Sequence, residues 1–201
     1  MILTWKDGKQ DKLHLFLNGD YTMTVDRAFA ASAGLHQNQE LDEAELALLT
    51  QQVNSRRAFN KGCELLTRRD HSRAELLTKL RQKGYAAGAE DALEQLDALG
   101  YLDDARFAES YAAELQRSRH YGKRRIEQAL LQKGVDRSVA RDAVEALTFA
   151  DEDLDALIQK KYLRYLSDEK GVRRTVNALL RLGYSYEDIR NALRRVEEDT
   201  E

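Results

Sequence analysis

The side chains that could perform catalysis or bind a metal are few in this sequence and poorly spaced for either task. Asp103 and Asp104 form an acidic pair that could hold a cation or transfer protons, but they stand at a predicted helix start, where capping explains them. The histidines are dispersed and lack the close spacing with cysteines or acids that a zinc site needs. They are His14, His36, His71 and His120. No phosphate-binding loop, dinucleotide fingerprint or nucleophile elbow is present, so we expect no enzyme, no metal, no cofactor and no small-molecule substrate.

The composition favours a cytoplasmic protein. The 201 residues are 42% hydrophobic and 33% charged, a balance typical of soluble helical domains. No apolar run approaches the roughly 20 residues that span a bilayer, and the first residues lack the order of a signal peptide. We therefore expect no membrane partner. Cys63 is the only cysteine and falls on an apolar stripe, which favours a core thiol over a nucleophile.

The strongest internal signal is a threefold repeat of basic, apolar and glycine positions. Segments ending at Gly84, Gly134 and Gly183 share one spacing, and these glycines recur about every 50 residues, a period typical of repeat architectures. Each glycine is predicted to follow a helix in a positive-φ conformation, with the next Tyr or Val packing back on the last turn. The tyrosines beside glycines could stack on nucleic-acid bases, but helix-end packing is the better interpretation; they are Tyr85, Tyr101, Tyr121 and Tyr184.

Apolar stripes at helical spacing flank each segment and predict three helices per repeat. The stripes before the segments are Phe59, Cys63 and Leu66, then Phe107, Tyr111 and Leu115, then Leu154, Leu157, Ile158, Tyr162 and Tyr165. The stripes after them are Ala89, Ala92, Leu93 and Leu96, then Val139, Ala143, Val144 and Leu147, then Ile189, Ala192, Leu193 and Val196. Predicted caps are Ser72 with Glu75, Asp103, and Ser185 with Asp188.

The N-terminal part follows a two-residue period instead. Leu13, Leu15 and Leu17 alternate with polar residues, and Asn18-Gly19 supplies a hairpin turn. A small β-hairpin or three-stranded sheet is expected to dock on the first repeat, and a helix capped by Asp42 to run unbroken into it. The expected domains are 1–40, 41–98, 103–147 and 152–197. The predicted fold is mainly α, with three tandem three-helix repeats forming an elongated, curved array.

Charge alternates with the repeat. Residues 54–85, 116–137 and 160–181 carry net charges of +6, +5 and +5, whereas the stretches between them are acidic and the whole chain is at −3. A single basic cluster is usually a solvated surface. Three clusters in register, however, predict a line of positive potential that suits a long, repetitive anionic partner such as duplex DNA, single-stranded DNA or the acidic rim of a protein filament.

The segment Gly100-Tyr-Leu-Asp-Asp-Ala-Arg106-Phe107-Ala108 resembles the signature of the RecX regulators, Gly-Tyr-Leu-Asp-Asp followed by Arg-Phe. Ser72-x-x-Glu-Leu-x-x-Lys-Leu-x-x-Lys-Gly-Tyr before it, and Gly122-x-x-Arg125-Ile126 with Lys133-Gly134 after it, stand in the family's order and spacing. The resemblance covers about residues 54–197, and the N-terminal hairpin resembles an extension carried by some members. Arg69-Asp70 and Lys123 depart from the family near positions where many relatives carry proline, which affects turn geometry more than function.

The resemblance implies a regulator of DNA repair and recombination that binds the RecA recombinase filament on single-stranded DNA and mostly inhibits it, with no chemistry of its own. Arginine is favoured at such contacts because its planar fork holds a carboxylate or phosphate through two bonds. The residues expected to contact the partner are Arg57, Arg68, Arg69, Arg73, Arg117, Arg119, Lys123, Arg124, Arg125, Lys161, Arg164, Arg173 and Arg174.

Two rival functions remain open from the sequence. A helix, a glycine turn and a second helix over 122–147 outline a helix-turn-helix, which would make the chain a direct DNA-binding protein. The net acidic charge allows only weak binding to single- or double-stranded DNA by charge alone. A generic helical adaptor with no link to recombination is the other alternative.

Overall fold

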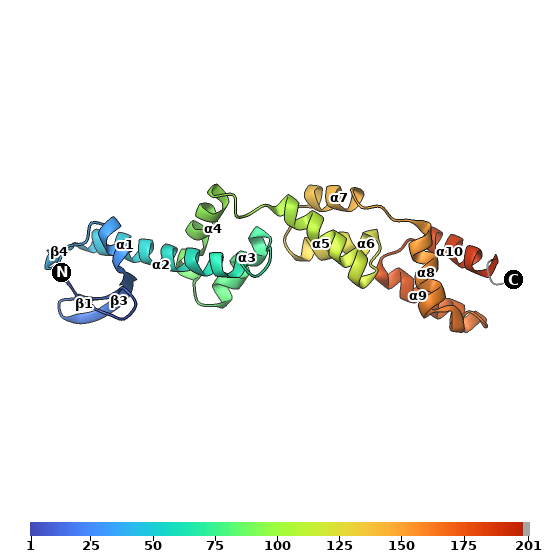
Figure 1. Ribbon diagram of the computed structural model, residues 1–201, viewed down its shortest axis with the longest axis horizontal. Coiled ribbons are helices and arrows are strands. Elements are labelled where there is room, and N and C mark those ends of the chain that lie inside the picture. The colour runs from blue at the N-terminus through green and yellow to red at the C-terminus, as the bar shows by residue number, and fades with distance from the viewer. Residues whose placement is uncertain (199–201) are drawn as a thin grey trace. The chain divides into compact units, whose positions relative to one another are not determined.

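A computed structural model of the protein describes residues 1–198, which are mostly helical with a small N-terminal sheet (Figure 1). The contacts divide the chain into two compact units. The first contains residues 1–67 and 77–99, and the second contains, within the described part of the chain, residues 68–76 and 100–198. The division passes through helix α3 (Arg73–Gln82).

The N-terminal sheet is antiparallel with strand order β3-β2-β1-β4. Its strands are β1 (Ile2–Asp7), β2 (Lys12–Leu17), β3 (Asp20–Asp26) and β4 (Gln39–Glu40). The predicted Asn18-Gly19 turn is confirmed, since both residues have positive φ, as a type I′ hairpin turn requires. The predicted small N-terminal sheet is confirmed, and β4 adds a fourth strand to the three expected ones by pairing Gln39 with Leu3. A two-residue strand has no periodicity from which the sequence could predict it.

The sheet packs on the N-terminal half of a long helix. Leu3, Leu13 and Leu15 are buried in one cluster with Leu49 and Val53 of α2 (Glu43–Leu66). The short helix α1 (Arg27–Ser32), which the sequence did not predict, contributes Ala30 to the same cluster. The predicted docking of the sheet therefore occurs on this helix.

Helix α2 runs without interruption, as predicted. Asp42 and Glu45 form a complete capping box, in which each side chain accepts a hydrogen bond from the other residue's amide. The predicted stripe of Phe59, Cys63 and Leu66 is only half-buried. The buried positions of this part of the helix are Ala58, Gly62 and Leu65 instead.

A close backbone approach explains that shift of the buried face. Helix α2 packs against the 3₁₀ turn η1 (Ala86–Gly88) and helix α4 (Ala89–Ala98). A Cβ at Gly88 would overlap the backbone of Asn54 and Ser55. Ser55, Ala58 and Gly62 are the small residues that α2 buries near this approach, and Cys63 is a half-buried thiol and not the predicted core residue.

In the second unit, two helix triplets each enclose a core. Helices α5 (Asp104–Arg119), α6 (Lys123–Gln132) and α7 (Arg137–Glu145) bury Phe107, Leu115, Ile126, Leu130 and Val144. Helices α8 (Asp151–Lys161), α9 (Glu169–Leu182) and α10 (Tyr186–Glu198) bury Leu154, Ile158, Leu179, Ile189 and Val196. These cores confirm most of the predicted stripes. Tyr165 is an exception, because α8 ends at Lys161 and Tyr165 lies exposed in the 3₁₀ turn η2 (Leu163–Tyr165).

The repeated glycines close helices as predicted. Gly84, Gly134 and Gly183 have φ of +87°, +75° and +96°. In each case the next residue's amide bonds to the carbonyl five residues earlier, in Tyr85 to Leu80, Val135 to Leu130 and Tyr184 to Leu179, which is the bond of a Schellman motif. The predicted helix-end packing is wrong for Tyr101, whose side chain is 54% exposed.

Candidate interaction surface

The thirteen predicted contact residues all lie within the described part of the chain. Eleven are exposed, whereas Arg73 and Arg125 are half-buried.

Two neighbouring hollows in the second unit bring four of these residues together. The larger, which we call the basic cleft, has a volume of about 490 Å³, and Arg117 from α5 and Lys161 from α8 lie on its wall with His120 and Lys160. The smaller has a volume of about 210 Å³ and is lined by Lys123 and Arg124 at the start of α6. Phe149, Ala150, Leu154 and Tyr184 line both hollows.

The basic cleft combines free cations with an apolar lining. Arg117, Lys160 and Lys161 make no ion pair among the described residues, and Asp153 is the one acidic residue that lines the cleft. The buried side chains of Leu154 and Leu157 contribute to its lining. Burial, with the nearby charge of Asp153, raises the pKa of the Tyr184 phenol, so this group stays protonated.

The start of α6 carries positive charge where a helix favours negative charge. Its first turn contains Lys123, Arg124 and Arg125, with no acidic residue, and its N-cap Gly122 offers no capping side chain. The amides are instead satisfied by the end of α9, because Gly122 donates to the carbonyl of Leu182 at 2.8 Å and Arg124 donates to that of Gly183 at 3.3 Å.

An equivalent joint links the segment 68–76 to α6. Ser72 occupies the position that Gly122 has in the next repeat, and its hydroxyl donates to the carbonyl of Lys133 at 2.5 Å. Lys133 precedes Gly134 as Leu182 precedes Gly183. The same kind of contact therefore occurs twice. At the first joint the side-chain hydroxyl of Ser72 makes it, and at the second joint the backbone amide of Gly122 makes it.

Glu75 is the centre of a charged cluster at the first of these joints. Its carboxylate accepts two hydrogen bonds from Arg69, at 2.8 and 2.9 Å. It also accepts one from His71 at 2.8 Å and one from Lys133 at 2.5 Å. Burial alone would raise the pKa of Glu75, but these hydrogen bonds outweigh it and hold the pKa well below the ordinary value.

This cluster revises the roles expected for Arg69, which was predicted to contact the partner, and for Glu75, which was predicted to help cap the helix. Ser72 caps the helix as predicted, accepting from the Glu75 amide at 3.1 Å. The Glu75 carboxylate, however, is occupied by Arg69, His71 and Lys133. The sequence signal for the cluster is the density of charge around 68–75, but Lys133 lies 58 residues away along the chain, so spacing could not identify it.

The remaining predicted contact residues are spread over other elements. In the first unit, Arg57 donates to the carbonyl of Thr24 at 2.9 Å. In the second, the Arg125 guanidinium lies 5.6 Å from the ring centroid of Tyr121, Arg164 lies 4.7 Å from that of Tyr165, and Arg173 is 3.3 Å from Glu169. Arg68 and Arg73 are engaged with other residues. Arg119 and Arg174 are exposed.

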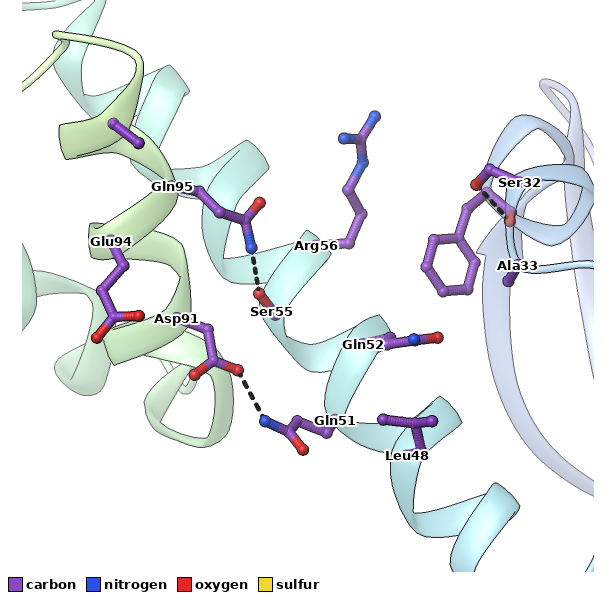
Figure 2. Close-up of a pocket in the computed structure, with 12 residues that line it drawn as sticks. Ser32, Ala33, Leu48, Gln51, Gln52, Ser55, Arg56, Asp91, Glu94 and Gln95 are labelled. Carbon is purple, nitrogen blue, oxygen red and sulfur yellow. Dashed lines mark hydrogen bonds between the residues drawn. The ribbon is translucent and has the colours of Figure 1, made fainter.

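The first unit has a different hollow that the sequence did not predict. Its volume is about 660 Å³, and residues of α1, α2 and α4 line it. Figure 2 shows Gln51 directed toward Asp91 and Gln95 toward Ser55, which are hydrogen-bonded at 3.2 and 2.9 Å. Glutamine amides thus bind Asp91 and the Ser55 hydroxyl on its wall.

Residues 1–198 contain neither a cluster of potential metal ligands nor a helix that could span a membrane. No group of three or more histidine, cysteine or acidic side chains is arranged there to hold a metal ion. None of the helices in that range has both the length and the hydrophobicity of a transmembrane span.

Comparison with known proteins shows which family has this arrangement. The sequence profile of the first three-helix domain of RecX matches residues 58–96, and that of the second matches residues 103–144. Regulatory protein RecX of Chlorobium phaeobacteroides is 31% identical over 146 residues, which cover 72% of this chain and 96% of that protein. Regulatory protein RecX of Clostridium tetani is 26% identical over 193 residues, which cover 92% and 88% of the two chains.

Solved structures show the same fold. A crystal structure of regulatory protein RecX superposes with a TM-score of 0.73 over 98% of both chains, at 21% identity. The crystal structure of RecX from Lactobacillus salivarius superposes with a TM-score of 0.62 over 72% of this chain and 97% of that one, at 24% identity.

Proposed function

The chain belongs to the RecX family of regulatory proteins, and from this premise we propose that it binds the RecA recombinase filament on single-stranded DNA and inhibits its recombinase and ATPase activities. The role is regulatory and involves no catalysis by the chain itself. The units that make contact are the repeats at 41–98, 103–147 and 152–197. Each contributes a modest contact, and tethering the contacts in one chain increases the overall affinity.

The basic cleft and its neighbour are the observation that carries this proposal. They gather Arg117, Lys123, Arg124 and Lys161 around an apolar lining. Such a surface suits an acidic protein segment that also offers an apolar side chain, because the rim pairs with carboxylates while the lining buries hydrocarbon. Phosphates need no such lining.

The unfavourable charge at the start of α6 gives independent support. Cations on the first turn of a helix oppose its dipole at a cost of about 0.3–1 kcal/mol each, and here three of them follow one another without a capping side chain. The carbonyls at the end of α9 satisfy amides of this turn but bring no acidic side chain to the three cations, and a broken local rule of this kind is typical of a functional surface. A partner that supplies negative charge would compensate for it.

Direct recognition of DNA by a helix-turn-helix is less well supported. Helix α7, which would be the recognition helix of the motif, carries Arg137 and Arg141 but also Asp142 and Glu145, so its net charge is zero. A helix that enters the major groove is expected to be basic. A helical adaptor unrelated to recombination would leave recombinase activity unchanged.

The decisive experiment follows ATP hydrolysis and strand exchange by RecA on single-stranded DNA while the protein is added below one copy per recombinase. We expect both activities to fall. Unchanged activities at concentrations where the protein is folded would refute the proposal and favour an unrelated adaptor. Duplex DNA binding that survives high salt, with no effect on the recombinase, would favour the helix-turn-helix alternative.

Charge reversal locates the contact surface. Replacing Arg117→Glu and Lys161→Glu together should weaken inhibition at least tenfold, because both cations are exposed and make no internal ion pair. The matched control is Arg190→Glu with Arg194→Glu, which reverses two exposed charges on α10, outside the basic segments. Equal loss of inhibition in both variants would remove the basic cleft from the proposed surface.

A further inference from the structure

The turn between α8 and α9 can be followed in the ribbon of Figure 1, and it carries an exposed aromatic ring and an exposed leucine among free cations. Leu163 is 42% exposed and Tyr165 is 44% exposed. Lys160, Lys161 and Arg164 are exposed beside them, and none of the three pairs with a carboxylate among the described residues. We call residues 160–165 the aromatic turn.

The nearby acids do not neutralise these cations, because α9 uses them. Asp168 is the N-cap of α9, where its carboxylate accepts from the amide of Gly171 at 2.6 Å. Glu169 lies 3.3 Å from Arg173 on the same helix. The positive charge of the aromatic turn is therefore available to a partner.

The turn is held in place by an unusually close backbone contact. Gly171 is buried in the first turn of α9, and a Cβ at this position would overlap the carbonyl oxygen of Tyr165. The turn also has two internal hydrogen bonds, from Tyr165 to Tyr162 and from Leu166 to Leu163. Tyr165 is thus presented on an ordered backbone although its side chain is exposed.

Arg164 lies over the ring of Tyr165. Its guanidinium lies 4.7 Å from the ring centroid and donates to the phenol oxygen at 2.6 Å. An aromatic ring with an adjoining guanidinium plane is a surface on which nucleic-acid bases stack, and neighbouring lysines can then neutralise the phosphates. Base stacking needs an exposed aromatic face, which Phe149 and Tyr184 of the basic cleft, both half-buried, do not offer to the same degree.

We propose that the aromatic turn is a stacking site for single-stranded nucleic acid, in which a base packs on Tyr165 and Arg164 while Lys160 and Lys161 bind the flanking phosphates. The choice of DNA as the strand rests on the proposed function, which places the chain on a filament that contains single-stranded DNA. Lys160 and Lys161 also line the basic cleft, whereas Tyr165 and Arg164 belong to the stacking site alone, so the stacking site is tested through Tyr165 without recombinase.

The test measures binding of the full chain alone to fluorescein-labelled oligothymidylate of about 15 nucleotides, by anisotropy at low salt. Tyr165→Ala should weaken binding about tenfold, and Tyr165→Phe should retain most of the affinity because the ring remains. The matched control is Tyr186→Ala, since Tyr186 is 63% exposed but is followed by Glu187 and Asp188. This control should bind like the unaltered protein.

An abasic strand of the same length separates stacking from charge. It should bind more weakly than oligothymidylate, and Tyr165→Ala should not change its affinity. Equal losses of affinity for both strands in Tyr165→Ala, or an equal loss in Tyr186→Ala, would overturn the stacking site. Tighter binding of oligouridylate than of oligothymidylate would overturn the assignment to DNA.

A membrane surface is the competing partner for lysines beside exposed leucine and tyrosine. Vesicles of phosphatidylcholine with phosphatidylserine provide that arm of the test. Loss of vesicle binding in Tyr165→Ala, with unchanged binding of the oligonucleotide, would overturn the proposal. Because no recombinase is present, failure of the stacking site leaves the proposed regulation of RecA intact, and unchanged recombinase activity would leave the stacking result intact.

Discussion

The amide of Gly122 donates a hydrogen bond to the carbonyl oxygen of Leu182 at 2.8 Å, so that the start of α6 is capped by the end of α9. The contact depends on the absence of a side chain, because a Cβ on Gly122 would lie 2.6 Å from the carbonyl carbon and oxygen of Gly183. The second and third helix triplets are therefore joined through backbone groups that only a glycine permits.

Gly122→Ala should consequently lower the free energy of unfolding by about 3 kcal/mol, because the backbone must move to relieve the overlap. Chemical denaturation measures this change. Gly84→Ala is the comparison, since a Cβ there meets no atom within 4 Å and only its φ of +87° opposes the substitution, at about 1 kcal/mol. A smaller loss of unfolding free energy in Gly122→Ala than in Gly84→Ala would show that the backbone at this joint can move at little cost.

Glu75→Gln should lower the free energy of unfolding at neutral pH by about 3 kcal/mol. The substitution leaves the partly buried Lys133, and Arg69, without their carboxylate, and breaking one side of such a pair is costly. Urea denaturation at pH 7 provides the measurement. A loss below about 0.5 kcal/mol would mean that the cluster contributes no more than exposed pairs do.

The same carboxylate should make stability depend on acid. The pKa of Glu75 is lower in the folded chain than its ordinary value of 4.5, so its contribution is complete above that value and is lost as the pH falls below it. We expect the difference in unfolding free energy between the unaltered protein and Glu75→Gln to shrink from about pH 5 to about pH 3. A difference that stays constant over this interval would contradict the lowered pKa.

Thr175→Val should raise the free energy of unfolding by about 1 kcal/mol. Thr175 is 1% exposed, and its hydroxyl oxygen is buried without a hydrogen-bond partner. Valine has nearly the same shape and removes the cost of the unsatisfied hydroxyl. Thr175→Ser is the control, because it keeps the hydroxyl and deletes the methyl group, and it should be destabilising. A destabilised valine variant would indicate that the hydroxyl is satisfied in solution.

Arg195→Lys should cost about 1 kcal/mol, because lysine cannot reproduce the two parallel hydrogen bonds that Arg195 donates to Asp155 at 2.7 and 2.9 Å. Arg194→Lys, at the preceding residue, should leave the free energy of unfolding almost unchanged, since the ion pair of Arg194 with Glu198 is exposed and 3.9 Å long. Thermal unfolding of the two variants gives the comparison. Equal effects would mean that the geometry of the Arg195 pair is unimportant.

Local patterns account for the parts of the fold that the sequence predicted. The spacing that ends at Gly84, Gly134 and Gly183 identified the helix ends, because positive φ after a helix is a property of glycine itself. The capping box at Asp42 was likewise readable, since both partners lie within four residues. In contrast, β4 exists only because its two residues pair with β1, which is distant in the sequence.

The basic segments, and the resemblance of the Gly100–Ala108 region to RecX regulators, were determined by the sequence alone, because composition and motif order need no coordinates. Tertiary structure decided how the charges are used. It placed Arg117 and Lys161 on one cleft, paired the exposed Arg69 with Glu75, and left Tyr165 exposed beyond the end of α8. The physical reason is that a side chain's partners depend on which helices pack together, and packing joins residues such as Glu75 and Lys133 that no local spacing relates.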